Sequence, residues 1–276
     1  MEILEEYADV LEKASIDEAF LDCTHKVGEE DPERYASKIK QAVKEKTGLL
    51  CSIGVTSSKS SAKIASDYKK PDGLTVIYPE DLKRFLESLA VDSVSGIGPK
   101  TQQALREMAI HTLGELANTD VQKLIGRFGK NGFWMWKVAN GTDHEPVEPR
   151  EDHVSLSTEA TLDSFTRDRQ IILNNLVDLV DELYERAQKR GYLFRTVGIK
   201  LVRTDFSIES REHTYQELQG SRESISNLIK DLLAKFTLSD DRPAIRKTGL
   251  RISHLERREK IQKRTAMQKS LLEFYE

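Results

Sequence analysis

Apolar and polar positions recur with two different periods along the first 78 residues. A helix over residues 3–13 is predicted by helical spacing of Ile3, Leu4, Tyr7, Val10 and Leu11. The run "ASIDEAFLD" over residues 14–22 reads as a strand, and "DPERYASKIKQAVKEKTG" as a helix that starts at Asp-Pro and stops at a glycine. Strands in "LLCSIGVT" and "PDGLTVIY" flank a short helix in "KSSAKIASDYKK". Together these elements predict an α/β or α+β unit that ends near residue 78.

The pattern changes twice further along the chain. Residues 79–140 lose the strand signal and read as short helices separated by glycines, and residues 141–153 form a charged linker with two prolines. Residues 154–255 follow the order β-α-β-β-α-β, which is typical of a four-stranded antiparallel sheet with two helices on one face. Residues 256–276 are a charged tail with an apolar end.

Composition limits the class of protein. The chain has 276 residues, enough for two or three domains, with 38% hydrophobic and 32% charged residues and no apolar run of membrane-spanning length. Two cysteines, Cys23 and Cys51, favour a reducing compartment over a disulfide framework or a zinc site. We therefore predict a cytoplasmic protein with no membrane partner. The net charge is -4, but the basic residues gather near the C-terminus, where a local surface could bind phosphate.

Asp17 and Glu18 are adjacent acids inside a run that otherwise favours burial. Successive strand residues point to opposite faces, so the pair indicates either an exposed edge or bulge, or a bend that brings both carboxylates to one side. Carboxylates are the ligands by which phosphoryl-transfer enzymes hold two Mg²⁺ ions. Taken alone, the pair favours the edge or bulge.

The stretch "CSIGVTSSKSSAKIASDYKKPDG", residues 51–73, resembles a phosphate-binding P-loop only superficially. Gly54 and Lys59 are one residue too close together, and Ser58 stands where that motif has a glycine. The stretch offers Ser and Lys at a helix N-terminus, with Lys63, Lys69 and Lys70 beyond. Backbone N–H groups and ammonium groups there could hold an anion, or the lysines could form a solvated basic helix face.

"SIDEAFLD" and "SIGVTSSKSSAKIASDYKKPDGLTVI" together resemble the Y-family DNA polymerases of the DNA polymerase IV type. The resemblance covers nearly the whole chain. It implies an α+β, multidomain fold with a partial catalytic palm (1–78), a small all-helical thumb (79–140), a linker (141–153), a β-α-β-β-α-β little finger (154–255) and a tail (256–276). The implied activity is template-directed DNA synthesis across damaged templates.

The same resemblance implies roles for individual residues. Asp17 would be a metal ligand, Glu18 the catalytic glutamate and a metal ligand, and Lys70 a contact to the triphosphate of the incoming nucleotide, with Ser15 and Ser52 supporting nucleotide binding. The implied cofactor is Mg²⁺, as two ions in the complete enzyme. The implied partners are primer–template DNA and deoxynucleoside triphosphates, bound by a monomer.

The sequence departs from the family in one respect. A "DxDxFF"-like strand with another metal-binding aspartate, and the small fingers domain that follows it, have no counterpart in these residues. We therefore expect an N-terminally truncated polymerase that is inactive or impaired on its own. The alternative is a non-catalytic module, derived from such a polymerase, that binds DNA and a sliding clamp.

In the helical region, "VSGIGPKTQQALREMAI" resembles a helix-hairpin-helix motif. Gly96 and Gly98 would let the backbone approach a DNA phosphate, with Lys100 and free N–H groups of the next helix beside it. The other interpretation is an ordinary turn. Phe133, Trp134 and Trp136 are assigned mostly to the core.

In the predicted sheet, Val197, Ile199 and Leu201 should face the helices. The opposite face is small, hydroxylic and basic, either for a DNA backbone or simply for solvent. Its candidate DNA-binding residues are Thr196, Lys200, Lys247, Arg251 and Ser253.

The tail ends with the spacing Q-x-x-L-x-x-F-Y, which resembles the box that binds the sliding clamps of archaea and eukaryotes, and so favours an archaeal source. One helical turn would place its apolar residues together as a plug for a hydrophobic pocket. The candidate clamp-binding residues are Gln268, Leu271, Phe274 and Tyr275.

Overall fold

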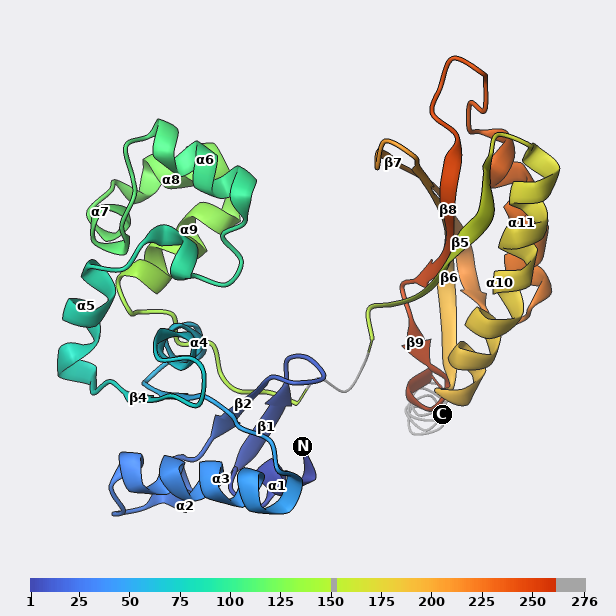
Figure 1. Ribbon diagram of the computed structural model, residues 1–276. Helices are drawn as coiled ribbons and strands as arrows, with labels where there is room; N and C mark the ends of the chain where they lie inside the picture. The colour runs from blue at the N-terminus through green and yellow to red at the C-terminus, as the bar shows by residue number, and fades with distance from the viewer. Residues whose placement is uncertain (150–152, 262–276) are drawn as a thin grey trace, which may run out of the picture. The chain divides into compact units, whose positions relative to one another are not determined.

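The computed structural model describes residues 1–149 and 153–261. Contacts divide the chain into two compact units, Met1–Arg150 and Glu151–Glu276, each with its own buried apolar cluster. Figure 1 shows the elements of both units. Within the described residues, none of the helices combines the length and the apolar character needed to cross a membrane.

The chain starts with a short helix and a hairpin, not with the predicted long helix and single strand. The elements are α1 (Glu2–Glu5), β1 (Val10–Lys13), β2 (Ala19–Asp22) and α2 (Thr24–Val27). β1 and β2 pair antiparallel, with Lys13 opposite Ala19. The helix predicted over 3–13 is wrong because tertiary pairing overrides local spacing: the Asp9 amide donates to Asp22 O at 2.7 Å, and its carboxylate accepts from the His25 amide.

The rest of the α+β region follows the prediction. Its elements are α3 (Pro32–Thr47), β3 (Ile53–Val55), α4 (Lys59–Tyr68) and β4 (Leu74–Val76). The side chain of Asp31 caps α3, and Gly48 ends it in the left-handed conformation, as the sequence indicated. β3 and β4 are parallel, and α4 lies so close to β3 that a Cβ on Gly54 would be 2.1 Å from Ala62 O.

Short helices fill residues 79–140, as predicted. They are α5 (Pro79–Glu87), the 3-10 helix η1 (Val91–Ser93), α6 (Pro99–Glu107), α7 (Leu113–Ala117), α8 (Val121–Phe128) and α9 (Lys130–Ala139). Their buried side chains form one cluster with Ile64 of α4, so this region packs against the α+β region. Trp134 and Trp136 pack on that cluster. Assigning Phe133 to the core was wrong: it is 46% exposed and stacks on Trp136 at the surface of α9.

The second unit has the predicted β-α-β-β-α-β order. Its elements are β5 (Ser155–Thr166), α10 (Arg169–Lys189), β6 (Tyr192–Arg203), β7 (Ile208–Gln219), α11 (Glu223–Ala234), β8 (Ile245–Ser253) and the short β9 (Glu256–Arg257). The antiparallel strands run in the order β5-β8-β6-β7, and α10 and α11 cover one face (Figure 1). Val197, Ile199 and Leu201 are buried in the apolar cluster beneath these helices, which confirms their predicted face.

Candidate functional site

Asp17 and Glu18 lie in the bend between β1 and β2, not within a strand. Ser15 organises the bend: its Oγ accepts from the amides of Asp17 (3.2 Å) and Glu18 (3.1 Å), and its hydroxyl donates to Asp17 Oδ1 at 2.5 Å. The bend closes where the Ala14 amide donates to Glu18 O at 3.0 Å. The adjacent acids are therefore held by a turn, and the rule that strand neighbours point to opposite faces does not apply to them.

A row of alternating charges leads from the bend onto α4. Lys63 Nζ lies 2.6 Å from Glu18 Oε1 and 3.2 Å from Asp67 Oδ2, and Lys70 Nζ lies 2.5 Å from Asp67 Oδ1. Lys63 is mostly buried, whereas Lys70 is half exposed. The structure thus brings the bend and the lysine-rich helix end together, although 45 residues separate Glu18 from Lys63.

Hydrogen bonds first, and nearby charges after them, favour the ionised form of Asp17. The hydrogen bond from Ser15 is the main cause of a lowered pKa, its own backbone amide adds to it, and Lys63 and Lys70 contribute further. Asp17 is fully exposed, so its carboxylate is open to solvent cations. An anionic, accessible oxygen ligand next to two ammonium groups is suited to a site that binds a cation and a phosphate side by side.

Ser52 and Lys40 hold the turn that follows Lys70. Ser52 Oγ accepts from the Gly73 amide at 3.0 Å. Lys40 Nζ reaches into the same turn, where it donates to Asp72 Oδ1 at 2.6 Å and to Cys51 O at 2.7 Å. Ser52 therefore holds the backbone of the turn that follows Lys70.

The carboxylate oxygens of Asp17 and Glu18 are the kind of ligand that a hard cation such as Mg²⁺ prefers. Mg²⁺ is held in proteins by one or two carboxylates, and waters and substrate phosphates complete its coordination. Asp17 and Glu18 would supply these carboxylates, but Glu18 would first have to leave Lys63. Across the described residues, no three His, Cys, Asp or Glu side chains gather as a metal-binding group.

The predicted hairpin of the helical region has the geometry of a tight backbone turn. Gly96 has φ +107°, and a Cβ there would lie 3.0 Å from the Trp134 ring. Gly98 is the N-cap of α6, has open space around it, and is followed by the exposed Lys100. The first turn of α6 thus presents free amides beside an ammonium group.

The open face of the sheet is more mixed than the sequence suggested. Thr196 is buried, and its Oγ1 already pairs with Thr214 Oγ1 at 2.9 Å and His254 Nδ1 at 2.8 Å. Ser253 is also buried, whereas Arg251 is exposed. Lys200 and Lys247 both form ion pairs with Glu159, whose position on this face the sequence analysis did not identify.

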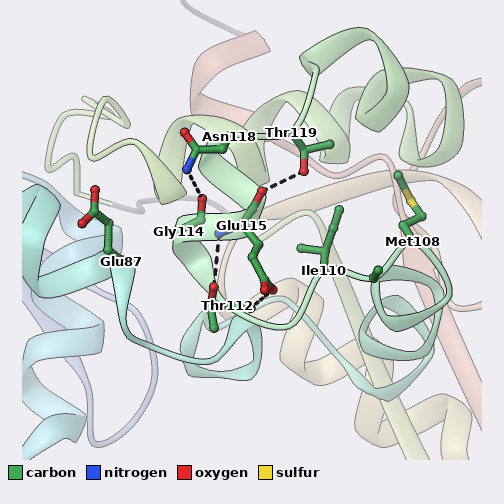
Figure 2. Close-up of a pocket in the computed structure, with 9 residues that line it drawn as sticks. Glu87, Met108, Ile110, Thr112, Gly114, Glu115, Asn118 and Thr119 are labelled. Atoms are coloured by element: carbon green, nitrogen blue, oxygen red, sulfur yellow. Dashed lines mark hydrogen bonds between the residues drawn. The ribbon is translucent and has the colours of Figure 1, made fainter.

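A hollow of about 640 Å³ lies elsewhere in the helical region, around the start of α7 (Figure 2). Polar groups along it bond to one another: the Glu115 amide donates to Thr112 Oγ1, Asn118 Nδ2 to Gly114 O, and Thr119 Oγ1 to Glu115 O. These contacts cap and extend α7. The predicted site residues do not line this hollow.

The sequence did not single out three residues that contact the bend, α4 or the turn after Lys70. Lys63 was noted only as one of three lysines, and Asp67 and Lys40 not at all. Asp67 carries a recognisable signal, since it lies four residues after Lys63 and three before Lys70 on a predicted helix, a spacing that favours ion pairs. The candidate clamp-binding residues lie outside the described residues.

Family models and relatives match both units. The impB/mucB/samB family model matches residues 1–67, and the C-terminal domain model of that family matches residues 153–265. A "DNA polymerase IV" of Nitrosopumilus maritimus is 36% identical over 92% of this chain and 71% of its own length. A "DNA polymerase IV" of Methanosarcina acetivorans is 36% identical over 94% of this chain and 73% of its own length.

Solved structures agree with the sequence relatives. A Y-family DNA polymerase chimera of Dbh and Dpo4 matches with a TM-score of 0.85 and 31% identity, over 93% of this chain and 74% of its own. An insertion ternary complex of Dbh DNA polymerase matches with a TM-score of 0.61 and 30% identity, over 93% and 74%. The mixed α/β fold and both family models thus have one explanation: this chain belongs to the Y family of DNA polymerases, which are DNA-directed DNA polymerases.

Proposed function

We propose that this chain takes part in template-directed DNA synthesis across damaged templates, with the β1–β2 bend and α4 as its nucleotidyl-transfer site. The observation that carries the proposal is the convergence of Asp17 and Glu18 with Lys63 and Lys70. Its segments 1–78, 79–140 and 154–255 would act as partial palm, thumb and little finger. The family membership supports the reaction type.

In this proposal the acidic residues hold the metal and a lysine contacts the triphosphate. Asp17 and Glu18 would hold Mg²⁺, which when bound neutralises negative charge that develops on the phosphoryl oxygens. Lys70, half exposed at the end of α4, would contact the triphosphate of the incoming nucleotide. Ser15 keeps both acids on the same bend, and Ser52 keeps the turn after Lys70 in place. Ser15 and Ser52 are thus positioning residues in this proposal.

DNA would be held by two further surfaces. In the helical region, the backbone at Gly96 and Gly98 and the ammonium group of Lys100 would contact a phosphate without reading sequence. On the sheet, Arg251 is exposed; Lys200 lies diagonally opposite it in the β6–β8 register, and Lys247 lies four residues before it on β8. Lys200→Ala combined with Arg251→Ala should weaken primer–template binding and flatten its salt dependence; unchanged affinity and slope would remove this face from the DNA site.

The second candidate is a non-catalytic module that binds DNA and a sliding clamp. The ion pair of Lys63 with Glu18 favours it, because a catalytic carboxylate engaged by a lysine is not free for a metal. The clamp-binding proposal rests on the sequence of the tail. In a pull-down, the double variant with Phe274→Ala and Tyr275→Ala should retain less sliding clamp than the unsubstituted chain. Equal retention would contradict the clamp-binding proposal.

Primer extension with Mg²⁺ and all four deoxynucleotides separates the two candidates. Extension by the chain, abolished by Glu18→Ala while DNA binding is retained, supports the polymerase. A template with an abasic site then tests the translesion role. Tight binding of primer–template with no extension supports the non-catalytic module.

A further inference from the structure

Glu159 lies on the open face of the sheet in the second unit, between two lysines. Its Oε2 is 2.5 Å from Lys247 Nζ, and its Oε1 pairs with Lys200 Nζ. Glu159 comes from β5, Lys247 from β8 and Lys200 from β6. One carboxylate therefore engages both lysines that were assigned to a DNA backbone.

Gly249 makes this arrangement possible. It lies in β8 opposite both Glu159 of β5 and Lys200 of β6, and strands on either side of a central strand are roughly 9–10 Å apart. A Cβ on Gly249 would be 3.1 Å from Glu159 Cγ and 3.5 Å from Lys200 Cε. The two side chains thus reach each other across the space that the glycine leaves open.

The cluster has an excess of positive charge without Glu159. Partial burial and the charge of Lys247 both lower the pKa of Lys200, which indicates that the two ammonium groups repel each other. A carboxylate between them offsets this repulsion. A phosphate oxygen makes the same charge-assisted hydrogen bonds to lysine, so both anions suit this position.

We propose that Glu159 is an internal substitute for a DNA phosphate, which occupies Lys200 and Lys247 until the sugar-phosphate backbone displaces it. The inference rests on the proposed DNA-binding role of this face and adds a residue that limits its affinity. Ion pairs of partly exposed side chains are weak, so a phosphate can replace the carboxylate. Each binding event then includes the release of Glu159, which reduces the net gain from both lysines.

Glu212 provides a matched control on the same face. It lies opposite Gly198 in the β6–β7 register and is exposed, and within the described part of the chain it has no ion pair. Glu159→Gln and Glu212→Gln remove the same charge with the same change of shape. A general effect of net charge should therefore be equal in both variants, whereas Glu159 acts on Lys200 and Lys247 and Glu212 lies across Gly198 from Arg251.

The test is fluorescence anisotropy with a labelled primer–template duplex over a range of salt concentrations. We expect Glu159→Gln to tighten binding about fivefold at low salt and Glu212→Gln less than about twofold. The salt slope of Glu159→Gln should become steeper by about one unit, since a phosphate then releases solution anions from the two lysines, whereas in the unsubstituted chain it releases Glu159. The gain should vanish when Lys200→Ala and Lys247→Ala are added. Equal gains for Glu159→Gln and Glu212→Gln would overturn the inference.

Arg251→Ala separates failure of the inference from failure of the DNA role. Arg251 lies outside the cluster and opposite Gly198, on the same exposed face. If Arg251→Ala weakens DNA binding and Glu159→Gln has no effect, only the role of Glu159 is overturned. If neither substitution changes affinity, the face does not bind DNA and both proposals fall. Thermal melts should show all variants folded, since the substituted side chains lie outside the apolar cluster.

Discussion

Lys63 Nζ and Glu18 Oε1 lie 2.6 Å apart and connect α4 to the bend between β1 and β2. The same ammonium group also pairs with Asp67, whose carboxylate pairs with Lys70. Lys63 therefore neutralises one of the two carboxylates that the family resemblance assigns to metal binding. A metal ion at the bend would therefore have to compete with a fixed ammonium group for Glu18.

Lys63→Gln should strengthen the binding of Mn²⁺, used as a probe for Mg²⁺, by about thirtyfold. Removing a unit charge about 4 Å from a divalent cation in a solvated site changes the interaction by about 2 kcal/mol. Lys69→Gln is the matched control, because the exposed Lys69 lies outside the ion-pair row. Mn²⁺ titration by calorimetry measures both; identical affinities for the two variants would mean that Lys63 does not oppose the metal.

Lys59→Met should destabilise the first unit by about 3 kcal/mol, the cost of removing one partner from a buried ion pair. Glu12 is 2% exposed, and its Oε2 lies 2.9 Å from Lys59 Nζ. Lys46→Met breaks a pair with Glu6 of the same length at the surface and should cost less than about 1 kcal/mol. Urea unfolding of both variants gives the comparison, and similar losses would show that burial of Glu12 does not matter.

Gly54→Ala should destabilise the first unit by about 1–3 kcal/mol, because its new methyl group would collide with the backbone of α4 at Ala62 and Ser66. Gly126→Ala should instead stabilise it by about 0.5–1 kcal/mol. Gly126 is an exposed position inside α8 with open space around it, where alanine favours the helix. Thermal unfolding should shift in opposite directions, and a stabilising Gly54→Ala would contradict the packing of α4 on β3.

Glu209→Gln should lower the free energy of unfolding at pH 7 by about 2 kcal/mol, as expected for a hydrogen bond to a charged group. Arg203 is buried and donates through Nε to Glu209 Oε1 at 2.8 Å. This hydrogen bond holds the pKa of Glu209 below its ordinary value of 4.5.

The pH dependence follows from the sign of that shift. A carboxyl whose pKa is lower in the folded state stabilises the protein above its unfolded-state pKa, and the effect disappears as the pH falls through the folded-state pKa. The difference between Glu209→Gln and the unsubstituted chain should be constant above about pH 5 and shrink below 4.5. Denaturant unfolding as a function of pH measures it, with Glu217→Gln on the same strand as control.

Local signals predicted most elements where caps and periodicity agree. The helix Pro32–Thr47 has both an Asp cap and a glycine stop, and β6 alternates over most of its length. The helix prediction failed over residues 3–13, where the apolar spacing fits a helix but pairing of β1 with β2 decides the structure. A four-residue strand has little local signal, because its stability comes from its partner.

The sequence by itself determined the order of the main elements from α3 onward, the second unit's sheet face, and the residue types that suit a metal and a phosphate. Only the tertiary structure decided that Asp17 and Glu18 share a bend, that Lys63 pairs with Glu18, and that Glu159 lies between Lys200 and Lys247 over Gly249. Periodicity gives the face on which a side chain lies, whereas strand order and register decide its neighbours on that face. Strand order and register both depend on pairing between segments that are distant in the sequence. The contacts of Glu18 and Glu159 with lysines therefore leave no local sequence pattern.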